Sequence, residues 1–154
     1  MDLWIKVTDK NSRSYERLIH PKIQEVTGIV DKKILSRAFY SLNALRNAEL
    51  DVLSGQRSGK IYKKPNVKKY YKASAAGEPP ASRTGALRLH WNGVVKNATS
   101  YGNGIRVLAE IESNSEYAGY LEHGTSKMAP RPFVKRIRDN AEPEVRKIFE
   151  APYL

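Results

Sequence analysis

The feature that most constrains the fold is an apolar stripe between Asp31 and Leu53. Its apolar residues recur at steps of three and four positions, which places them on one face of an α-helix. Asp31 is of a type that caps helix N-termini, and Gly55 is of the type that follows helix C-termini. We therefore predict a long amphipathic helix over 31–53, packed on a sheet or on another subunit. The stripe consists of Ile34, Leu35, Ala38, Phe39, Leu42, Leu45, Ala48 and Val52.

Two weaker patterns precede this helix. The segment Leu3 to Thr8 alternates apolar and polar residues and is followed by a turn-like cluster, so it predicts a short strand. The segment Tyr15 to Val26 has apolar residues at loosely helical spacing. Pro21 lacks the backbone N–H that a helix interior needs, so we expect any helix there to be short or to begin again at Pro21.

An antiparallel hairpin is predicted after Gly85. The run from Leu87 to Val95 is rich in apolar residues, and the run from Ile105 to Ile111 has an apolar residue at every second position. Between them, Tyr101-Gly102-Asn103-Gly104 is a strong turn signal. The second run is typical of a strand with one buried and one exposed face, which pairs with the first.

The C-terminal part predicts a further helix after a loop over Gly124 to Pro132. Pro132 suits the first turn of a helix, because the N–H that it lacks would be unpaired there. Phe133 is the expected buried anchor of this helix, and Pro143 is expected to kink or restart it. The fold class is thus α+β: a small, mostly antiparallel sheet with one long amphipathic helix packed on it, a C-terminal helix and a long basic loop.

Positive charge is concentrated between the long helix and the hairpin. The chain has a net charge of +11, and seven Lys and Arg residues with no Asp or Glu lie between Arg57 and Lys72. Residues 57–83 show no periodicity beyond a ragged hairpin at Ile61-Tyr62 and Tyr70-Tyr71, so we predict a long loop there, of a length that is usually functional or disordered. The basic residues are Arg57, Lys60, Lys63, Lys64, Lys68, Lys69 and Lys72.

Composition excludes several classes of protein. A chain of 154 residues suits one domain over 1–154, and the absence of Cys excludes disulfide frameworks, thiolate metal sites and Cys nucleophiles. No apolar run is long enough to span a membrane, and Met1 to Lys10 lacks the apolar core of a signal peptide. We therefore expect a soluble protein made in a cytoplasm, without membrane contact.

The residues of catalytic sites are not found in recognisable patterns. His20, His90 and His123 match no zinc spacing, and there is no phosphate-binding loop of the Gly-Lys-Ser type or nucleophile elbow. An acidic cluster that would hold magnesium is also missing. The sequence predicts no enzyme, no metal and no cofactor. A hydrolase or nuclease that uses Glu122 and His123 is the weakest alternative.

Two segments together resemble one family. The first comprises Gly77-Glu78-Pro79-Pro80, Arg83-Thr84-Gly85 and Leu87-Arg88, and the second runs from Tyr117 to Met128 and is closed by Arg131-Pro132-Phe133. These segments, and the long helix before them, are similar to the head–tail joining proteins of long-tailed lambda-like bacteriophages, also called neck or tail-completion proteins. The resemblance covers roughly Ile29 to Glu150, and the second segment is the more specific one.

The resemblance implies a small α+β fold with a structural role in the virion and no catalysis. The expected function is to form a cyclic ring at the head–tail junction of a tailed phage or prophage during virion assembly in the host cytoplasm. The expected partners are further copies of the chain and the neighbouring connector and tail proteins. Such a ring would bury apolar helix surface heterologously, with one patch of each subunit meeting a different patch of the next.

The same residues also have interpretations in terms of physical chemistry alone. Thr84, Gly85, Gly124, Pro132 and Phe133 are expected mainly to set backbone geometry and packing. Charged or polar residues beside these rigid turns are candidates for contacts with another subunit or connector, because Arg forms bidentate pairs with carboxylates. In particular, Glu122 is predicted to pair with an Arg of the neighbouring subunit. The interface candidates are Arg88, Glu122, Thr125 and Arg131.

Three interpretations of the basic segment remain, in order of preference. It is a docking arm that folds onto an acidic partner, or a solvated loop that keeps the protein soluble, or a surface that contacts DNA. The last gives the main alternative function, a nucleic-acid-binding module, because Tyr62, Tyr70 and Tyr71 lie among the Lys residues and aromatic rings can stack on bases.

Overall fold

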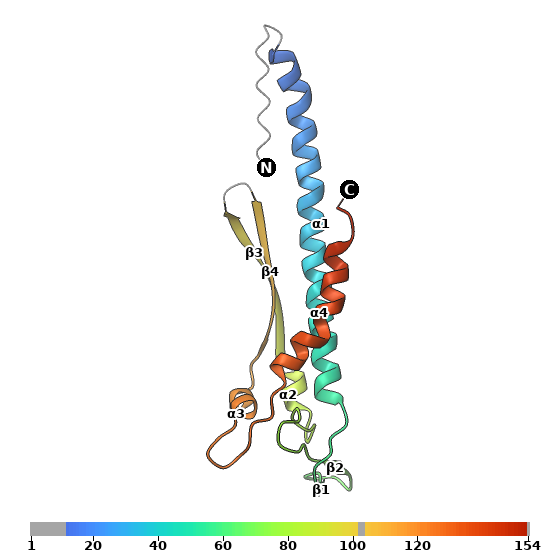
Figure 1. Ribbon diagram of the computed structural model, residues 1–154, viewed down its shortest axis with the longest axis vertical. Coiled ribbons are helices and arrows are strands. Elements are labelled where there is room, and N and C mark those ends of the chain that lie inside the picture. Colours follow the sequence, from blue (N-terminus) through green and yellow to red (C-terminus); the bar gives the residue numbers. More distant parts are fainter. Residues whose placement is uncertain (1–11, 102–103, 154) are drawn as a thin grey trace.

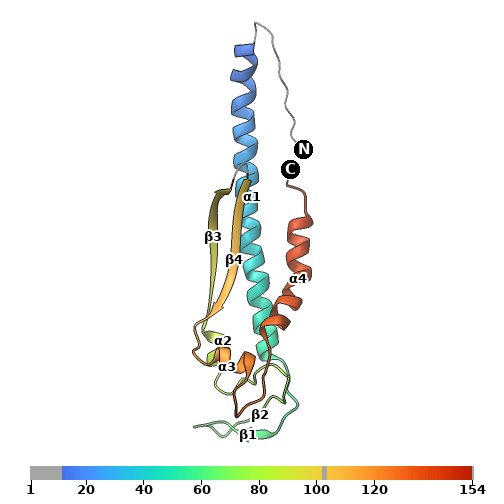
Figure 2. The same ribbon diagram turned by 60° about the vertical axis from the view of Figure 1, so that its left-hand side comes forward.

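A computed structural model describes residues 12–101 and 104–153, and its helices and strands confirm the α+β class. A long hairpin and the C-terminal helix lie alongside one long N-terminal helix, as Figures 1 and 2 show. The strand predicted over Leu3 to Thr8 lies outside the described residues. The elements are α1 (Ser12–Ser54), β1 (Ile61–Lys63), β2 (Tyr70–Lys72), α2 (Ala86–Leu89), β3 (Trp91–Tyr101), β4 (Gly104–Ser113), α3 (Ala118–His123) and α4 (Val134–Glu150).

Helix α1 is longer than the sequence predicted. It runs for 43 residues without a break, which at 1.5 Å per residue is roughly 65 Å. The prediction that a helix would be short or begin again at Pro21 was wrong, because one missing hydrogen bond does not stop a helix that continues on both sides. The N-cap at Asp31 was wrong for a related reason. The turn before Asp31 supplies the carbonyls that its neighbours need, so no unpaired N–H is left to cap.

The C-terminus of α1 lies where it was predicted. The helix ends at Ser54, and the N–H of Gly55 donates to the Asp51 carbonyl at 3.1 Å. Gly55 does not adopt the left-handed backbone that a C-terminal glycine often supplies. The guanidinium of Arg57 instead donates to the Val52 carbonyl at 2.6 Å, so a cation satisfies the end of the helix.

Strands β3 and β4 form the predicted antiparallel hairpin. The register runs from Trp91 opposite Ser113 to Tyr101 opposite Gly104, with a shift after Ala98. Residues 102–103 of the predicted turn lie outside the described part of the chain. The first strand begins later than predicted, because residues 86–89 form the short helix α2. Ala, Leu and Arg are strong helix formers, which accounts for the difference.

The hairpin packs one face on α1. Gly93 of β3 lies so close to Leu42 of α1 that a Cβ at position 93 would lie 2.8 Å from the Leu42 Cδ1. On β4, Val107 and Ala109 face the helices, while Leu108 between them points outward and is 48% exposed. The alternation predicted from the sequence therefore matches the packing of this strand.

Helix α4 runs antiparallel to α1 and closes the core (Figure 1). Phe133, immediately before the helix, is 1% exposed and meets the Trp91 ring edge-on with centroids 6.1 Å apart. Burying such a ring contributes roughly 1.5–3 kcal/mol, and the predicted anchor is confirmed. The other buried apolar residues of this cluster are Ala48, Val52, Leu53, Ile137 and Ala141.

The two proline predictions for α4 have different outcomes. Pro132 lies before the helix, which begins at Val134, and not in its first turn. Pro143 lies within one continuous helix, so the helix does not restart there, and the kink stays a prediction. The C-terminal end is held by Arg37 of α1, whose guanidinium donates to the carbonyls of Phe149 at 3.3 Å and Pro152 at 2.8 Å. A cation at the C-terminus of a helix interacts favourably with the helix dipole.

The ragged hairpin that the sequence indicated within the long loop 57–83 is present. Strands β1 and β2 pair antiparallel, with Tyr62 opposite Tyr71. The N–H of Gly59 donates to the Ala73 carbonyl at 2.9 Å and the N–H of Ala73 donates to the Lys60 carbonyl at 2.8 Å, which extends the pairing toward α1. The Glu78 carboxylate then closes the segment by accepting the N–H groups of Ser58 at 3.0 Å and Ala75 at 2.9 Å. We refer to residues 57–78 as the basic hairpin.

Candidate docking surface

The two sequence segments that carry the resemblance meet at a single cavity. It has a volume of about 560 Å³ and lies at the end of the molecule where α2, α3 and the basic hairpin come together (Figure 1). Pro80, Arg83–Gly85 and Leu87-Arg88 of the first segment line the cavity together with Tyr117, Leu121, Met128 and Arg131 of the second. Residues 89–116 separate the two segments in the chain, so only the tertiary structure brings them together.

Arg88 and Arg131 are both anchored at this cavity by contacts within the chain. The Arg88 guanidinium donates to Ser54 Oγ at 3.1 Å, at the end of α1. Nη1 of Arg131 donates to both the carbonyl and the hydroxyl of Ser74, which is buried. Both residues also line the cavity, so the structure brings these two predicted interface residues together. Their contact with another subunit stays a prediction.

Glu122 has a role within the chain that the sequence did not predict. Its Oε2 accepts the backbone N–H of Phe133 at 2.8 Å and that of Val134 at 3.1 Å. A carboxylate there accepts from two otherwise unpaired N–H groups at the N-terminus of α4, and its negative charge interacts favourably with the helix dipole. Glu122 thus joins α3 to α4 and belongs to the structural frame of the cavity. Pairing with an Arg of a neighbouring subunit stays a prediction.

The small predicted residues set the turns around the cavity. Gly85 and Gly124 have positive φ angles of 86° and 76°, as the expectation of special backbone geometry requires. Thr84 Oγ1 accepts the Ala86 N–H at 3.3 Å, and Thr125 Oγ1 accepts the Lys127 N–H at 3.3 Å. Thr125 is exposed and lies outside the cavity lining, so its hydroxyl caps this turn, and its predicted contact with another subunit stays a prediction.

The basic hairpin presents unpaired positive charge beside the cavity. Of the seven basic residues predicted for the docking loop, Arg57 does not contribute free charge, because its guanidinium donates to the carbonyls of Val52 and Pro80 and anchors the segment. The other basic residues form no ion pair with a described residue, and Tyr71 of β2 also lines the cavity. These residues are Lys60, Lys63, Lys64, Lys68, Lys69 and Lys72.

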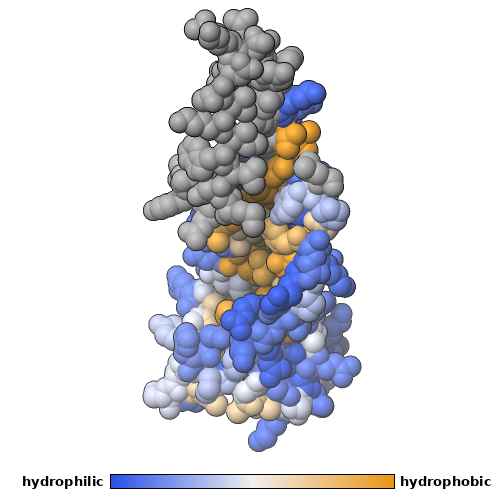
Figure 3. Space-filling view, turned by 45° about the horizontal axis from the view of Figure 1, so that its top comes forward, coloured by the Kyte–Doolittle hydropathy of each residue, from blue (hydrophilic) through white to orange (hydrophobic). Residues whose placement is uncertain are grey.

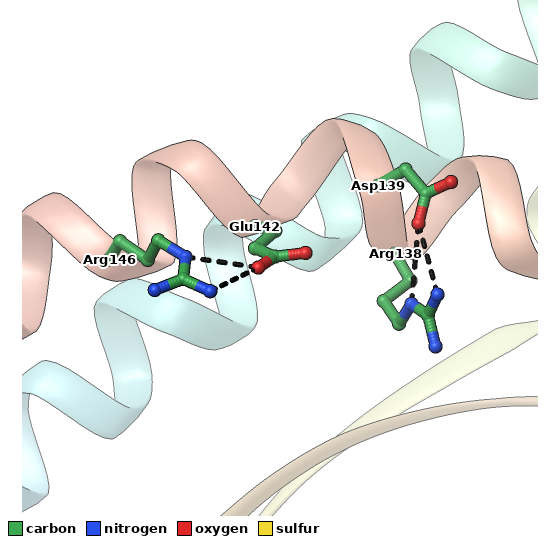
Figure 4. Close-up of polar contacts among 4 residues, drawn as sticks. All are labelled: Arg138, Asp139, Glu142 and Arg146. Carbon is green, nitrogen blue, oxygen red and sulfur yellow. Dashed lines mark hydrogen bonds and ion pairs between the residues drawn. The ribbon is translucent and has the colours of Figure 1, made fainter.

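Helix α4 shows the opposite treatment of charge. Arg146 donates to Glu142 at 2.6 Å, and Arg138 pairs with Asp139 at 3.2 Å, all on exposed parts of the helix (Figure 4). The Glu142 carboxylate raises the pKa of Arg146. Such surface pairs contribute little stability, but they neutralise the helix surface. The unbalanced charge of the described chain is therefore concentrated around the basic hairpin and the cavity.

A buried carboxylate behind the cavity was missed by the sequence analysis. Glu49 of α1 is 0% exposed, and its Oε2 accepts from Nη1 of Arg46 at 2.7 Å. Its Oε1 has no hydrogen-bond partner among the described residues. Burial raises the pKa of this carboxyl, and the charges of Arg46 and Arg88 oppose that effect. Its position, four residues after Leu45 and three before Val52, lies on the apolar face of the helix and was the available signal, although a Glu is seldom fully buried.

A second surface is apolar and lies along the helices. A groove of about 350 Å³ between α1, β4 and α4 is lined by Leu45, Val107, Val145 and Phe149 among others. On α1, Phe39 follows the lining residue Ala38 in the chain and is 51% exposed. Figure 3 shows a strip of hydrophobic surface on the upper half of the molecule, whereas hydrophilic residues cover most of the lower half of this face. Isolated apolar side chains are normal on surfaces, but a larger grouping of them is a candidate interaction site.

The described residues were compared with the requirements of a metal site and of a membrane-spanning helix. Within 12–101 and 104–153, three His, Asp or Glu side chains do not gather anywhere in an arrangement that would hold a metal ion. His123 at the end of α3 and His90 after α2 lie in separate turns. Among the helices of the described part, none is both long and apolar enough to cross a membrane.

Comparison with known proteins adds no relative. No family model, no curated protein and no solved structure matches this chain. The functional interpretation therefore rests on the cavity, the basic hairpin and the apolar groove, together with the residues that line them.

Proposed function

We propose that this chain is a structural virion protein of a tailed bacteriophage or prophage. It forms a cyclic ring at the head–tail junction and acts in neck formation or tail completion during virion assembly. The observation that carries the proposal is the convergence of two distant segments on one cavity. Residues 83–88 and 117–133 carry the resemblance to the joining proteins, and they form one surface beside the basic hairpin.

The apolar groove supports the ring. In a monomer, Phe39, Tyr40 and Phe149 are 51%, 61% and 42% exposed. Helix α1 also extends beyond both the β3–β4 hairpin and α4, and neither covers its N-terminal part (Figures 1 and 2). A heterologous contact in a closed ring covers one such patch with a different patch of the next subunit. In this proposal the mechanism is mechanical: the ring completes one end of the connector, and the basic hairpin meets an acidic partner surface.

The decisive experiment is electron microscopy of lysates from a phage or prophage that lacks this gene. The proposal expects filled heads and finished tails side by side and unattached, with joining restored by the gene supplied in trans. Normal numbers of intact virions would rule out the joining role.

Self-association is tested separately by sedimentation of purified variants. Phe39→Glu, on the exposed side of α1, is expected to reduce ring formation. Val67→Glu is the matched control, because Val67 is similarly exposed at 46% but lies in the basic hairpin. Glu122→Arg addresses the predicted pairing between subunits. If rings still form with this variant, Glu122 acts only within the chain.

Nucleic-acid binding is the second candidate, and the basic hairpin is the observation that favours it. Six Lys side chains without an ion pair to any described residue lie there with exposed Tyr62 and Tyr70, a combination suited to phosphates and bases. This function predicts DNA binding that weakens steeply as salt is added. An affinity that stays flat across a salt series would exclude it.

A further inference from the structure

The cavity at the meeting point of α2 and α3 combines an apolar floor with a basic rim. Leu53, Leu87, Leu121 and Met128 supply apolar side chains, and Leu53 is only 3% exposed. Its volume of about 560 Å³ lies within the range of pockets that hold small ligands or anchoring side chains. The site is therefore large enough to take an apolar side chain of a partner, together with adjacent polar groups.

Three arginines line this cavity, and no Asp or Glu does. They are Arg83, Arg88 and Arg131. The carboxylate of Glu49 interacts electrostatically with Arg88, but it is fully buried and already paired with Arg46. The cavity therefore presents uncompensated positive charge toward solvent, and complementarity of charge favours an anionic ligand.

The guanidinium groups retain free donors. Arg83 is exposed and forms no side-chain hydrogen bond with a described residue. The described contacts of Arg131 and Arg88 all run through Nη1, which leaves Nε and Nη2 of each without a described partner. A planar fork of N–H groups suits a carboxylate, which it binds through two parallel hydrogen bonds.

The positions of these groups are fixed by the fold. Arg131 is held by Ser74, and its own N–H donates to the Leu121 carbonyl at 2.8 Å. Gly85 starts α2 with a left-handed backbone, and Pro80, which also lines the cavity, is buried. A site already formed in the free protein loses little entropy when a ligand binds, which favours recognition of a short segment.

We propose that this cavity binds an acidic peptide segment of a partner protein, with one apolar side chain on the floor and flanking carboxylates on the three arginines. The apolar floor favours a peptide over nucleic acid, because phosphates alone would leave the floor empty. The neighbouring lysines of the basic hairpin extend the same positive surface along the peptide. This inference deepens the proposed function and rests on it for the source of the peptide, a connector or tail protein.

Fluorescence anisotropy with the intact protein tests the inference. The probe is a short labelled peptide of Asp and Glu residues around one central Leu. Two companion probes are the same peptide with Ser in place of Leu, and a single-stranded DNA oligonucleotide of equal charge. We expect the Leu peptide to bind at physiological salt and the Ser peptide to bind at least about tenfold more weakly.

Protein variants locate the contact. Arg83→Ala removes an exposed side chain without a described partner, so it leaves the fold intact and is expected to weaken binding of the Leu peptide at least about tenfold. Lys135→Ala is the matched control, since this exposed residue of α4 carries the same charge and lies outside the cavity. Lys68→Ala, in the basic hairpin, is expected to have a smaller effect than Arg83→Ala.

Each contrary result has a distinct meaning. No binding of the Leu peptide, equal binding of the Ser peptide, or equal losses in all three variants would overturn the inference. Tighter binding of the oligonucleotide with dependence on Arg83 would overturn it in favour of nucleic acid. Sedimentation and gene deletion are scored independently, so rings and joining without peptide binding refute the peptide site alone. Peptide binding with intact virions from the deletion refutes the joining role alone.

Discussion

Glu122 Oε2 accepts the backbone N–H of Phe133 at 2.8 Å, and this contact ties the end of α3 to the start of α4. The same oxygen accepts the next N–H, from Val134. Phe133 is the most buried large apolar residue of the core, so the carboxylate fixes the backbone from which that ring enters. The α3–α4 connection also carries Met128 and Arg131 of the docking cavity, and the capping contact therefore supports the candidate site as well as the core.

Removal of this cap is expected to destabilise the protein. Glu122→Ala leaves two N–H groups unsatisfied at the helix N-terminus and should cost about 1–2 kcal/mol of unfolding free energy. Glu122→Gln keeps one acceptor oxygen and should cost less. Urea denaturation provides the measurement, with Glu116→Ala as a control at an exposed position without a described hydrogen bond. Equal effects at positions 116 and 122 would show that the cap contributes nothing.

Glu49 is expected to give an unusual pH dependence of stability. Burial raises the pKa of this carboxyl above 4.5, so the folded protein holds its proton more tightly than the unfolded chain does. The associated stability is fully present below the unfolded pKa and is lost as pH rises through the folded pKa. Glu49→Gln cannot ionise and should lack this loss.

The measurement is a series of urea denaturation curves from below pH 4.5 to neutral pH for the wild type and Glu49→Gln. The difference in unfolding free energy, wild type minus variant, should fall as pH rises. A difference that stays constant across the series would contradict the buried-carboxylate interpretation. Asp51→Asn is a suitable control, because Asp51 lies on the same helix but is exposed.

Glu78 is expected to act in the opposite direction. Hydrogen bonds from the hydroxyl and N–H of Ser58 and from the N–H of Ala75 lower its pKa to about 2. Its contribution is present above the unfolded pKa and is lost as pH falls toward about 2. NMR titration of the Glu78 side chain should show this low pKa directly.

Loss of the Glu78 contacts should loosen the basic hairpin without unfolding the core. In Glu78→Gln at neutral pH, the amides of Ser58 and Ala75 are expected to exchange with deuterium faster than in the wild type, while the amides of α4 are unchanged. Glu116→Gln is the control for loss of an exposed carboxylate. Unchanged exchange at Ser58 and Ala75 would mean that the carboxylate does not close the hairpin.

Two glycines of the second motif segment are expected to respond in opposite ways to Ala. Gly124 has φ 76° and ψ −179°, and a Cβ there would lie 2.8 Å from the Met128 carbonyl oxygen and 2.8 Å from the Pro130 nitrogen. Gly124→Ala should therefore cost about 1–3 kcal/mol or more. Gly119 lies in α3 with nothing within 4 Å of a Cβ, so Gly119→Ala should be neutral or stabilise by up to about 1 kcal/mol. Thermal unfolding of both variants compares them, and similar melting temperatures would refute this account.

The elements with strong local periodicity were predictable from the sequence. The stripe from Ile34 to Val52 identified the core of α1, because a spacing of three and four can bury one face only as a helix. The alternation from Ile105 to Ile111 identified β4 for the corresponding reason in strands. Phe133 was identified as an anchor because an apolar ring beside a fixed proline is seldom left exposed.

Short elements were mispredicted where local preferences compete. Residues 86–89 were assigned to a strand on their apolar content, although Ala and Leu also favour a helix, and the left-handed Gly85 starts a helical turn there. The extension of α1 to Ser12 across Pro21 reflects the cooperativity of a long helix, which a residue-by-residue reading underestimates. The hairpin in 57–78 depends on Glu78 and Arg57, whose partners lie up to 23 positions away in the chain.

The sequence by itself determined the two kinds of periodic element, the concentration of basic residues between them and the glycines that need special backbone angles. Those properties depend on neighbours within a few positions. Only the tertiary structure decided that Arg83, Arg88 and Arg131 share one cavity and that Glu122 caps α4. It also decided that Glu49 is buried while Arg57 is an anchor. These outcomes depend on which groups remain unsatisfied once distant segments pack, because a buried polar group is stabilised only by the partners that the fold brings to it.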